Sequence, residues 1–320
     1  STLSSSSAAS DVYKRQAYRF TILGRILSPL TNKRKDEYGC SLENMARFPI
    51  MVADAIKSAC GRDFIIEASV SGDEPEGGRT LAETIELAKL LAGHIDILQL
   101  RAQDLDPAHP AGFNPERTPF LYMAEAVKKS VADIAVSTVG GYLNPEVSEE
   151  IIASGKADFI AMARAWISNP DYGKLVNEGR SEDLVPCIRC NYCINPSFEA
   201  PPISTCSVNP IWGLEHKIDL MISPPTRKKR VAIIGGGPAG MKAALVAAGR
   251  GHAVTLFEKS NVLGGLFKTM DYVSFKWPQR EYKDWLIRQV LKSGIKVILN
   301  TEPLPMMLSL IHISEPTRPY

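Results

Sequence analysis

The sequence lacks long apolar runs, has little net charge, and contains only five histidines in 320 residues. No stretch approaches the roughly 20 consecutive apolar residues of a transmembrane helix, and no signal peptide with an apolar middle region opens the chain. The formal net charge of +2 gives no basis for nucleic-acid binding, and the basic run at 227–230 directly precedes an apolar strand pattern. We therefore expect a cytoplasmic protein that has neither a membrane nor a nucleic acid as its partner.

The two ends of the chain differ in character from its interior. Residues 1–16 and 308–320 resemble translated sequencing-adapter reads, and we set both segments aside as artefacts. The interior is then expected to start and stop within a longer gene. A natural serine-rich tail and a natural C-terminus are the alternative.

Short apolar runs alternate with segments of helical period between about residues 45 and 175. The expected strands are 64–70, 96–101, 134–140 and 158–164, and the expected helices are 81–92, 119–131 and 144–155. This repeat of β/α units predicts an α/β fold, either a TIM barrel or a doubly wound sheet. Four units would form half of a barrel, because a closed TIM barrel has eight.

Four of the six cysteines follow a metal-binding pattern. Cys187, Cys190 and Cys193 form a CxxCxxC triple, and Cys206 follows in the same loop-rich stretch. Four thiolates can close around an iron–sulfur cluster or a structural zinc ion, and the spacing favours the cluster because zinc ribbons usually pair two CxxC motifs. Cys40 and Cys60 stand alone and are expected to be buried small hydrophobes.

A glycine-rich motif, GGGPAG, directly follows the apolar strand pattern VAII and opens a helix. In the GxGxxG pattern, Gly235 allows the tight turn, Gly237 lets backbone approach a pyrophosphate, and Gly240 permits close helix packing. The next expected strand ends in Glu258, which is placed to bind a ribose hydroxyl of FAD or NAD. Gly265, in the pair Gly264–Gly265, suits either a second close approach to a dinucleotide or a plain turn.

The loops after the last two expected β/α strands carry Gly140–Gly141 and Ala163–Arg164. In a β/α barrel these loops commonly bind phosphate, so backbone amides and one guanidinium could hold the phosphate of FMN. An ordinary strand exit and a surface salt bridge are the alternatives. His109, in the loop after 96–101, is a catalytic candidate, although a lone loop histidine is more often merely exposed.

Three stretches resemble the group of 2,4-dienoyl-CoA reductases, enoate reductases and trimethylamine dehydrogenase, whose barrel is that of old yellow enzyme. They are LSPLTNKRKDEYGCSLENMARF at 27–48, the cysteine loop that ends in CSVNP, and IIGGGPAG with LFEK. Bile-acid steroid reductases belong to the same group. The resemblance covers residues 20–302, and it departs from the group at Thr21, where many members have a proton-donating tyrosine, and at Ser69, where many have an arginine near the flavin.

The resemblance implies an organisation of the interior and a set of cofactors. Residues 17–180 would be the C-terminal half of an FMN-binding TIM barrel, 181–228 an iron–sulfur cysteine loop and linker, and 229–307 the first part of a Rossmann-like FAD/NAD(P) domain. A [4Fe-4S] cluster on the four cysteines, FMN and FAD would relay electrons from NAD(P)H. The full-length form could be a homo-oligomer.

The implied reaction is the reduction of an activated C=C bond in a small-molecule substrate, which would be an enoyl-CoA, an enoate or an unsaturated steroid. An amine dehydrogenase of the trimethylamine type and a non-catalytic electron-transfer flavoprotein are the alternatives. The substitutions at Thr21 and Ser69 favour the electron carrier.

Overall fold

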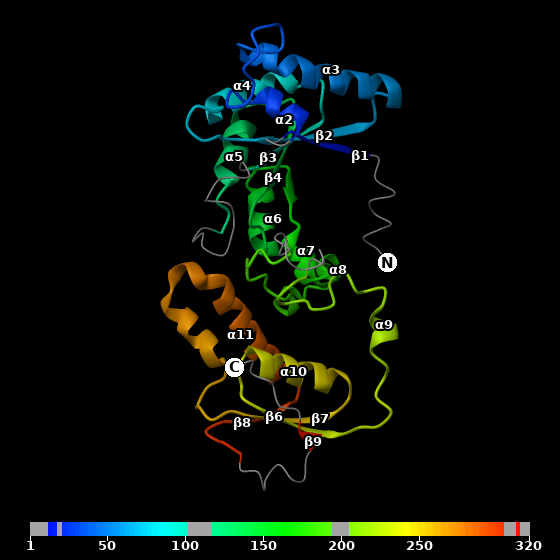
Figure 1. Cartoon of the computed structure of the whole chain (residues 1–320), viewed down its shortest axis with the longest axis vertical. Coiled ribbons are helices and arrows are strands. Elements are labelled where there is room, and N and C mark those ends of the chain that lie inside the picture. The colour runs from blue at the N-terminus through cyan, green and yellow to red at the C-terminus, as the bar shows by residue number, and fades with distance from the viewer. Residues whose placement is uncertain (1–11, 18–20, 102–116, 194–204, 304–311, 314–320) are drawn as a thin grey trace. The chain divides into compact units, whose positions relative to one another are not determined.

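The structure is a computed structural model, and it describes residues 12–17, 21–101, 117–193, 205–303 and 312–313 (Figure 1). The chain forms two compact units, Ser1–Ala163 and Arg164–Tyr320. The sequence-based boundary at residue 180 lies inside the second unit. His109 lies outside the described residues.

The first unit contains a parallel sheet whose strands are neighbours in chain order. Its strands are β1 (Val12–Ala17), β2 (Ile65–Ser71), β3 (Ile97–Arg101), β4 (Ala135–Val139) and β5 (Phe159–Ala161). The expected strands from residue 64 onward correspond to β2 to β5. Sequential parallel pairing with a helix in each connection is the β/α arrangement, so the predicted α/β class is confirmed.

The helices of this unit are α2 (Ile22–Leu27), α3 (Leu42–Cys60), α4 (Leu81–Leu91), α5 (Leu121–Ser130) and α6 (Pro145–Ala153). The three expected helices match α4, α5 and α6. Thr80 and Glu83 form a capping box at the start of α4, and Asn144 caps α6. Helix α3 was not predicted from the sequence. Cys40 precedes α3 and Cys60 is its last residue, and both are exposed, so the prediction that both are buried was wrong.

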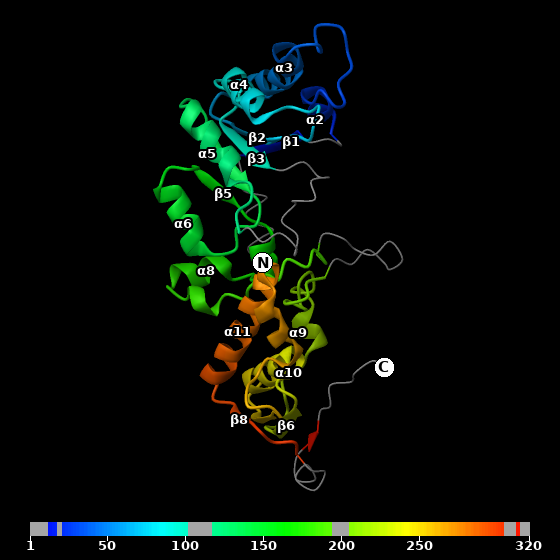
Figure 2. The same cartoon turned by 90° about the vertical axis from the view of Figure 1, so that its left-hand side faces the viewer.

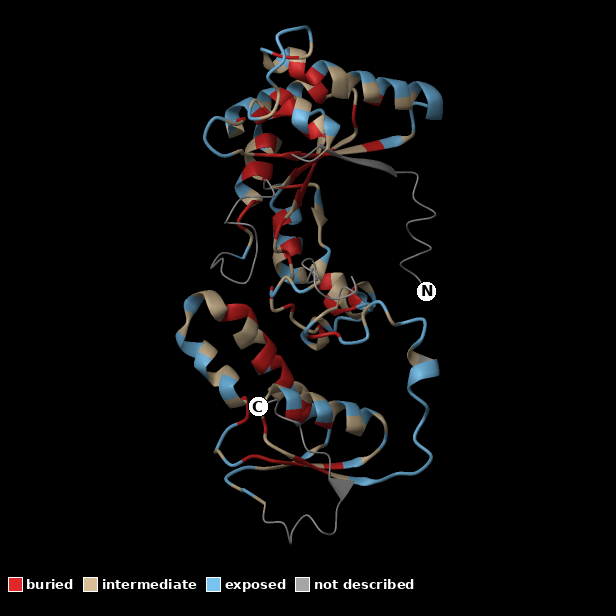
Figure 3. Ribbon diagram, viewed as in Figure 1, coloured by how far each residue is buried: buried red, intermediate tan, exposed pale blue. Residues whose placement is uncertain are grey.

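The two faces of this sheet differ in polarity. Alternate strand residues pack with the helices in one apolar core, which includes Val70, Leu98 and Val136. Buried stretches of the strands and helices are red in Figure 3. The residues between them on β2 and β3 include Ser69 and Gln99, both buried and polar. One face is therefore sealed by helices, and the other presents polar groups.

Strand β1 lies within a segment that sequence analysis largely set aside. Its backbone pairs in parallel with β2 from Val12–Ile65 to Ala17–Val70. The short strand β9 (His312–Ile313), in the other excluded segment, pairs with β6 (Arg230–Ile234). The structure thus uses both segments as sheet edges.

The second unit begins with α7 (Arg164–Ser168), α8 (Tyr172–Asn177), η1 (Ser181–Asp183) and α9 (Ile218–Met221). A parallel sheet in the order β8-β7-β6-β9 follows, with β7 (Ala253–Phe257) and β8 (Lys296–Ile298). The helices α10 (Pro238–Gly249) and α11 (Trp277–Lys292) lie on one face of this sheet (Figures 1 and 2), and η2 (Gly265–Tyr272) and η3 (Ser274–Lys276) precede α11. The strand, glycine turn and helix expected from residue 230 are therefore present.

Among the described residues, no helix combines the length and the apolar character that a membrane crossing requires.

Candidate functional site

The four cysteines of the predicted metal site line one cavity in the second unit. Cys187, Cys190, Cys193 and Cys206 share its wall with Arg164, Ile167, Ile188, Ser207 and Val208. The cysteine loop, defined here as residues 187–193, turns sharply because Arg189 and Asn191 have left-handed backbones, with φ of 52° and 58°. Such φ values are uncommon outside glycine, and here they fold a seven-residue stretch around the cavity.

The surroundings of the sulfurs act against ionisation of the free thiols. Burial raises the pKa of Cys187 and of Cys193, and the neighbouring Cys206 raises both further. The positive charge of Arg164 opposes both shifts. A bound cationic centre would keep these sulfurs as thiolates, which is the form that ligates metal.

Two of the sulfurs also have hydrogen-bond partners, one in the backbone and one in a side chain. The Arg189 backbone N–H donates to Cys187 Sγ at 3.5 Å, and Cys190 Sγ lies 3.2 Å from Ser207 Oγ. Hydrogen bonds to ligand sulfurs are one of the means by which a protein tunes an iron–sulfur centre.

The cysteine loop is docked onto α11 rather than extended as a free connector. The guanidinium of Arg189 is fully buried and lies over the ring of Trp277, 4.6 Å from its centroid. Gln279 Nε2 donates to the Ile188 carbonyl at 3.5 Å. Cys206 and Val208 pack in the same apolar core as Ile233 and Met241 of the dinucleotide fold. A cation–π contact of a desolvated arginine contributes about 2 kcal/mol, so this docking is a substantial constraint.

The glycine turn has the close contacts that its motif predicts. Gly235 has φ of 96°, and a Cβ on Gly240 would lie 1.9 Å from the Gly235 carbonyl oxygen. A Cβ on Gly265 would lie 2.8 Å from the Cα of Gly237, and Gly264 N–H donates to the Gly236 carbonyl at 2.8 Å. The turns at 235–237 and 264–265 therefore abut and leave room for backbone alone.

Glu258 lies directly after β7 with its carboxylate against the glycine turn. Its Oε2 accepts a hydrogen bond from Gly236 N–H at 2.6 Å, and its Oε1 accepts from the backbone and the hydroxyl of Ser260, both at 2.8 Å. Burial alone would raise the pKa of Glu258, but these hydrogen bonds and the Lys268 ammonium hold that pKa below its usual value. The carboxylate is therefore ionised and fixed beside the turn.

The predicted FMN residues fall in both units. Gly140 and Gly141 follow β4 with φ of 145° and 84°, and Ala163 closes the first unit. A Cβ on Gly140 would lie 2.4 Å from the Phe120 ring. Arg164 opens the second unit, where its Nη1 donates to Asn191 Oδ1 at 2.7 Å. Sequence analysis did not foresee that contact with the cysteine loop.

The two positions that depart from the resemblance have local partners. Thr21 caps α2, with its Oγ1 accepting from Gly24 N–H at 3.1 Å. Ser69 Oγ donates to Gln99 Oε1 at 3.1 Å, and Gln99 Nε2 donates to Glu67 at 2.9 Å and more weakly to Ser137 at 3.4 Å. This chain of polar contacts crosses β2, β3 and β4, and sequence analysis missed it. The sequence does contain a signal for it, because polar residues occur at alternate positions of these otherwise apolar strands.

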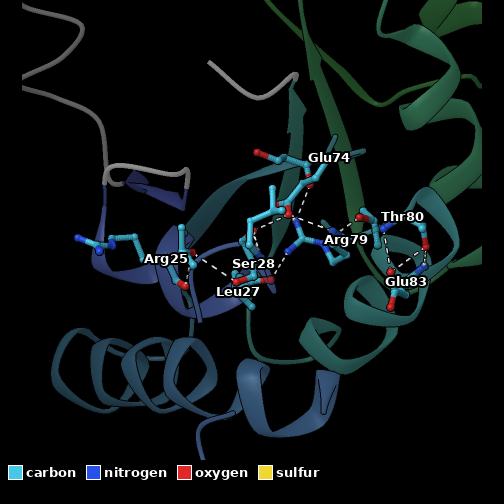
Figure 4. Close-up of polar contacts among 12 residues, drawn as sticks. Arg25, Leu27, Ser28, Glu74, Arg79, Thr80 and Glu83 are labelled. Carbon is cyan, nitrogen blue, oxygen red and sulfur yellow. Dashed lines mark hydrogen bonds and ion pairs between the residues drawn. The ribbon is translucent and has the colours of Figure 1, made fainter. Parts of the chain in front are cut away.

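A buried arginine organises the loop after β2 (Figure 4). Arg79 is 1% exposed, and it donates to the Leu27 carbonyl at 2.6 Å, to the Ser71 carbonyl at 2.5 Å and to Thr84 Oγ1 at 3.0 Å. Its backbone N–H donates to Glu74 Oε2 at 3.0 Å. Sequence analysis missed this network too. It ties together segments at the carboxyl end of a strand, the end where β/α barrels carry their active sites.

Comparison with known proteins matches both units to flavin enzymes. The model of the NADH:flavin oxidoreductase / NADH oxidase family matches residues 11–183, and the model of FAD dependent oxidoreductases matches residues 230–292. An NADH oxidase of Thermoanaerobacter brockii is 39% identical over 283 residues, and a cinnamate reductase of Clostridium sporogenes is 34% identical over 288 residues. These alignments cover 86% and 84% of this chain, and 43% of each relative.

A solved structure is similar over nearly the whole chain. The complex of 2-naphthoyl-CoA reductase with 2-naphthoyl-CoA superposes with a TM-score of 0.88 at 32% identity. The superposition covers 98% of this chain and 49% of the reductase chain. The chain thus spans less than half the length of each of these relatives.

Proposed function

The chain belongs to the NADH:flavin oxidoreductase / NADH oxidase family, and from that membership we propose that it serves the NAD(P)H-dependent reduction of an activated C=C bond. The substrate class is an enoyl-CoA, an enoate or an unsaturated steroid. Family membership confirms the resemblance seen in the sequence and a TIM barrel of the old yellow enzyme type joined to an FAD-type domain. A cinnamate reductase and a 2-naphthoyl-CoA reductase among the relatives support the reaction class.

One observation carries the proposal, namely that all four cysteines line one cavity, and Cys206 packs against the same apolar core as Ile233 and Met241, which flank the glycine turn. Within the described residues, no three side chains of His, Cys, Asp or Glu are gathered tightly enough for one metal ion. Zinc would need sulfurs about 2.3 Å from a single centre. A [4Fe-4S] cluster is larger than one zinc ion, so its four thiolates are held further apart.

The glycine turn and Glu258 would hold FAD. Gly235, Gly237 and Gly240 offer a side-chain-free surface at the start of α10, where the N–H groups and the helix dipole favour a pyrophosphate. Gly265 extends that surface from the second turn. Glu258 Oε2 accepts one hydrogen bond and keeps a lone pair for a ribose hydroxyl, whereas Oε1 already accepts two.

Gly140, Gly141, Ala163 and Arg164 would hold the phosphate of FMN, and His109 would act on the substrate. When bound, FAD, the cluster and FMN would supply electron transfer from NAD(P)H to the double bond. The chain's own residues would exclude water from the cysteine cavity, supply the four sulfurs and fix the two glycine turns. Arg79 would order the loop after β2 at the substrate end of the barrel.

The test has two steps, both made under anaerobic conditions on the protein expressed from the full-length gene. The cofactor content is measured first, and substrate turnover is measured second. We expect about four irons and four sulfides per chain, together with both FMN and FAD. Cinnamate, an enoyl-CoA and an unsaturated ketone are then offered with NADH and with NADPH. Zinc in place of iron, or FAD without FMN, would overturn the proposal.

A non-catalytic electron carrier is the second candidate, because Thr21 and Ser69 are both used locally. Thr21 caps a helix and Ser69 is buried against Gln99, so neither side chain offers what the tyrosine and arginine of the resemblance would supply. A carrier would pass electrons from NADH to a dye and reduce none of the three substrates.

A further inference from the structure

Arg164 faces the cysteine cavity as well as opening helix α7. Its side chain lines the cavity that the four cysteine sulfurs share. Its Nη1 donates to Asn191 Oδ1 at 2.7 Å, and Asn191 has a left-handed backbone conformation between Cys190 and Cys193. The guanidinium is therefore held by the cysteine loop itself.

Charge distinguishes Arg164 from its neighbours around the cavity. Apart from the cysteines, the lining residues in the described part of the chain are Ile167, Ile188, Ser207 and Val208, none of which carries a charge. A fixed cation in a site of low dielectric acts strongly on the charge that the sulfurs hold.

We propose that Arg164, oriented by Asn191, sets the reduction potential of the iron–sulfur cluster held by the four cysteines. This inference rests on the proposed function, because it requires the cluster. Reduction adds one electron to an assembly that is already negative, so a fixed guanidinium stabilises the reduced form more than the oxidised form and raises the potential. Arg164 is thus a positioning residue for electron transfer, in addition to the phosphate role expected from the sequence.

The decisive measurement is the midpoint potential of the cluster, obtained by titration with dithionite and followed by electron paramagnetic resonance. R164Q removes the charge, and we expect about a tenfold loss in the ratio of reduced to oxidised cluster at a fixed potential, which is 59 mV for a one-electron couple. R164K keeps a charge but not the planar fork, so a smaller shift in the same direction is expected. N191A removes the side chain that orients the guanidinium, so its midpoint potential is expected to lie between those of wild type and R164Q.

The matched control is R250Q, which removes an arginine charge from the end of α10 in the same unit. Arg250 donates to the Ser223 carbonyl and does not line the cavity. Its removal is expected to leave the midpoint potential unchanged. An equal shift in R164Q and R250Q would show a general effect of net charge and would overturn the inference.

The remaining outcomes separate this inference from the proposed function. R164Q with full iron, an unchanged potential and weaker FMN binding overturns the inference and leaves Arg164 as a phosphate ligand alone. Absence of iron and sulfide from the wild-type protein defeats the proposed function instead. If R164Q itself cannot hold iron, N191A decides, since a lowered potential supports the inference and an unchanged one refutes it.

Discussion

The two units differ in how their predicted functional residues are brought together. In the second unit, the four cysteines line one cavity, and Glu258 lies hydrogen-bonded to the glycine turn. In the first unit, the predicted residues are Gly140 and Gly141 at a strand exit, Ala163, and His109 outside the described residues, and the polar network that surrounds Arg79 was not predicted at all. A site built from one contiguous motif can therefore be foreseen from sequence, whereas a site assembled from several strand ends needs the fold.

The two units also differ in what stabilises their interiors. The second unit packs its cysteine loop into an apolar core by stacking Arg189 on Trp277. The first unit satisfies buried polar groups with one another, as in the contacts of Ser69 with Gln99. All four tryptophans, at positions 166, 212, 277 and 285, belong to the second unit. Tryptophan fluorescence therefore reports on one unit, and far-ultraviolet circular dichroism reports on both.

The largest effect is expected from replacing a cysteine of the cavity. Cys187→Ser removes a buried sulfur, and we expect the iron content to fall from about four per chain to a small fraction, because [4Fe-4S] clusters need four thiolates. The control is Cys60→Ser at the exposed end of α3, which should leave iron unchanged. Iron and sulfide analysis decides, and equal iron in both variants would contradict the four-cysteine site.

A change to Arg79 should affect the first unit alone. Arg79→Met removes the guanidinium that lies 3.8 Å from Glu74 Oε1 and donates to two carbonyl groups, and breaking a buried charged contact costs about 3–5 kcal/mol. In urea we expect an early loss of circular dichroism while the tryptophan transition stays in place. Arg62→Met, at an exposed position, is the control. If the tryptophan transition shifted by as much as the circular dichroism transition, the two units would not unfold independently, and the prediction would be wrong.

A change at the glycine turn should shift the tryptophan transition, because the turn belongs to the second unit. Gly240→Ala places a Cβ 1.9 Å from the Gly235 carbonyl oxygen, and we expect a destabilisation of about 1–3 kcal/mol with weaker FAD binding. Gly249→Ala on the same helix meets nothing within 4 Å and should stabilise by up to about 1 kcal/mol. Urea unfolding followed by tryptophan fluorescence gives the free energy of unfolding of both variants. Equal changes in the two variants would refute the close-contact explanation.

The smallest effect is expected from acid titration of Glu258. Its folded pKa lies below the ordinary value of 4.5, so its ionised form stabilises the fold fully above that value, and the stabilisation is lost as pH falls through the folded pKa. The tryptophan transition should therefore weaken below about pH 4.5. Glu258→Gln should show less of this dependence, and an unchanged pH profile in that variant would assign the effect to other carboxylates.

The sequence was sufficient to predict strands β2 to β5, because continuous apolar runs mark buried parallel strands. It was insufficient for α3, which has a proline at position 49 and an exposed C-terminal half. Contacts such as Ser69 with Gln99 depend on strand register, which one sequence does not reveal. Arg164 and Asn191 are 27 residues apart, and they meet only because the loop adopts left-handed turns that neither residue type requires.

The stacking of Arg189 on Trp277 has a consequence for how such proteins can be recombined. The loop that carries the cysteines and the helix α11 share one buried contact, although 88 positions separate the two residues. A chimera that takes the loop from one relative and the helix from another would bury an arginine against whatever side chain the new helix supplies. The two segments are therefore expected to be exchangeable between family members only as a pair, although they lie far apart in the sequence.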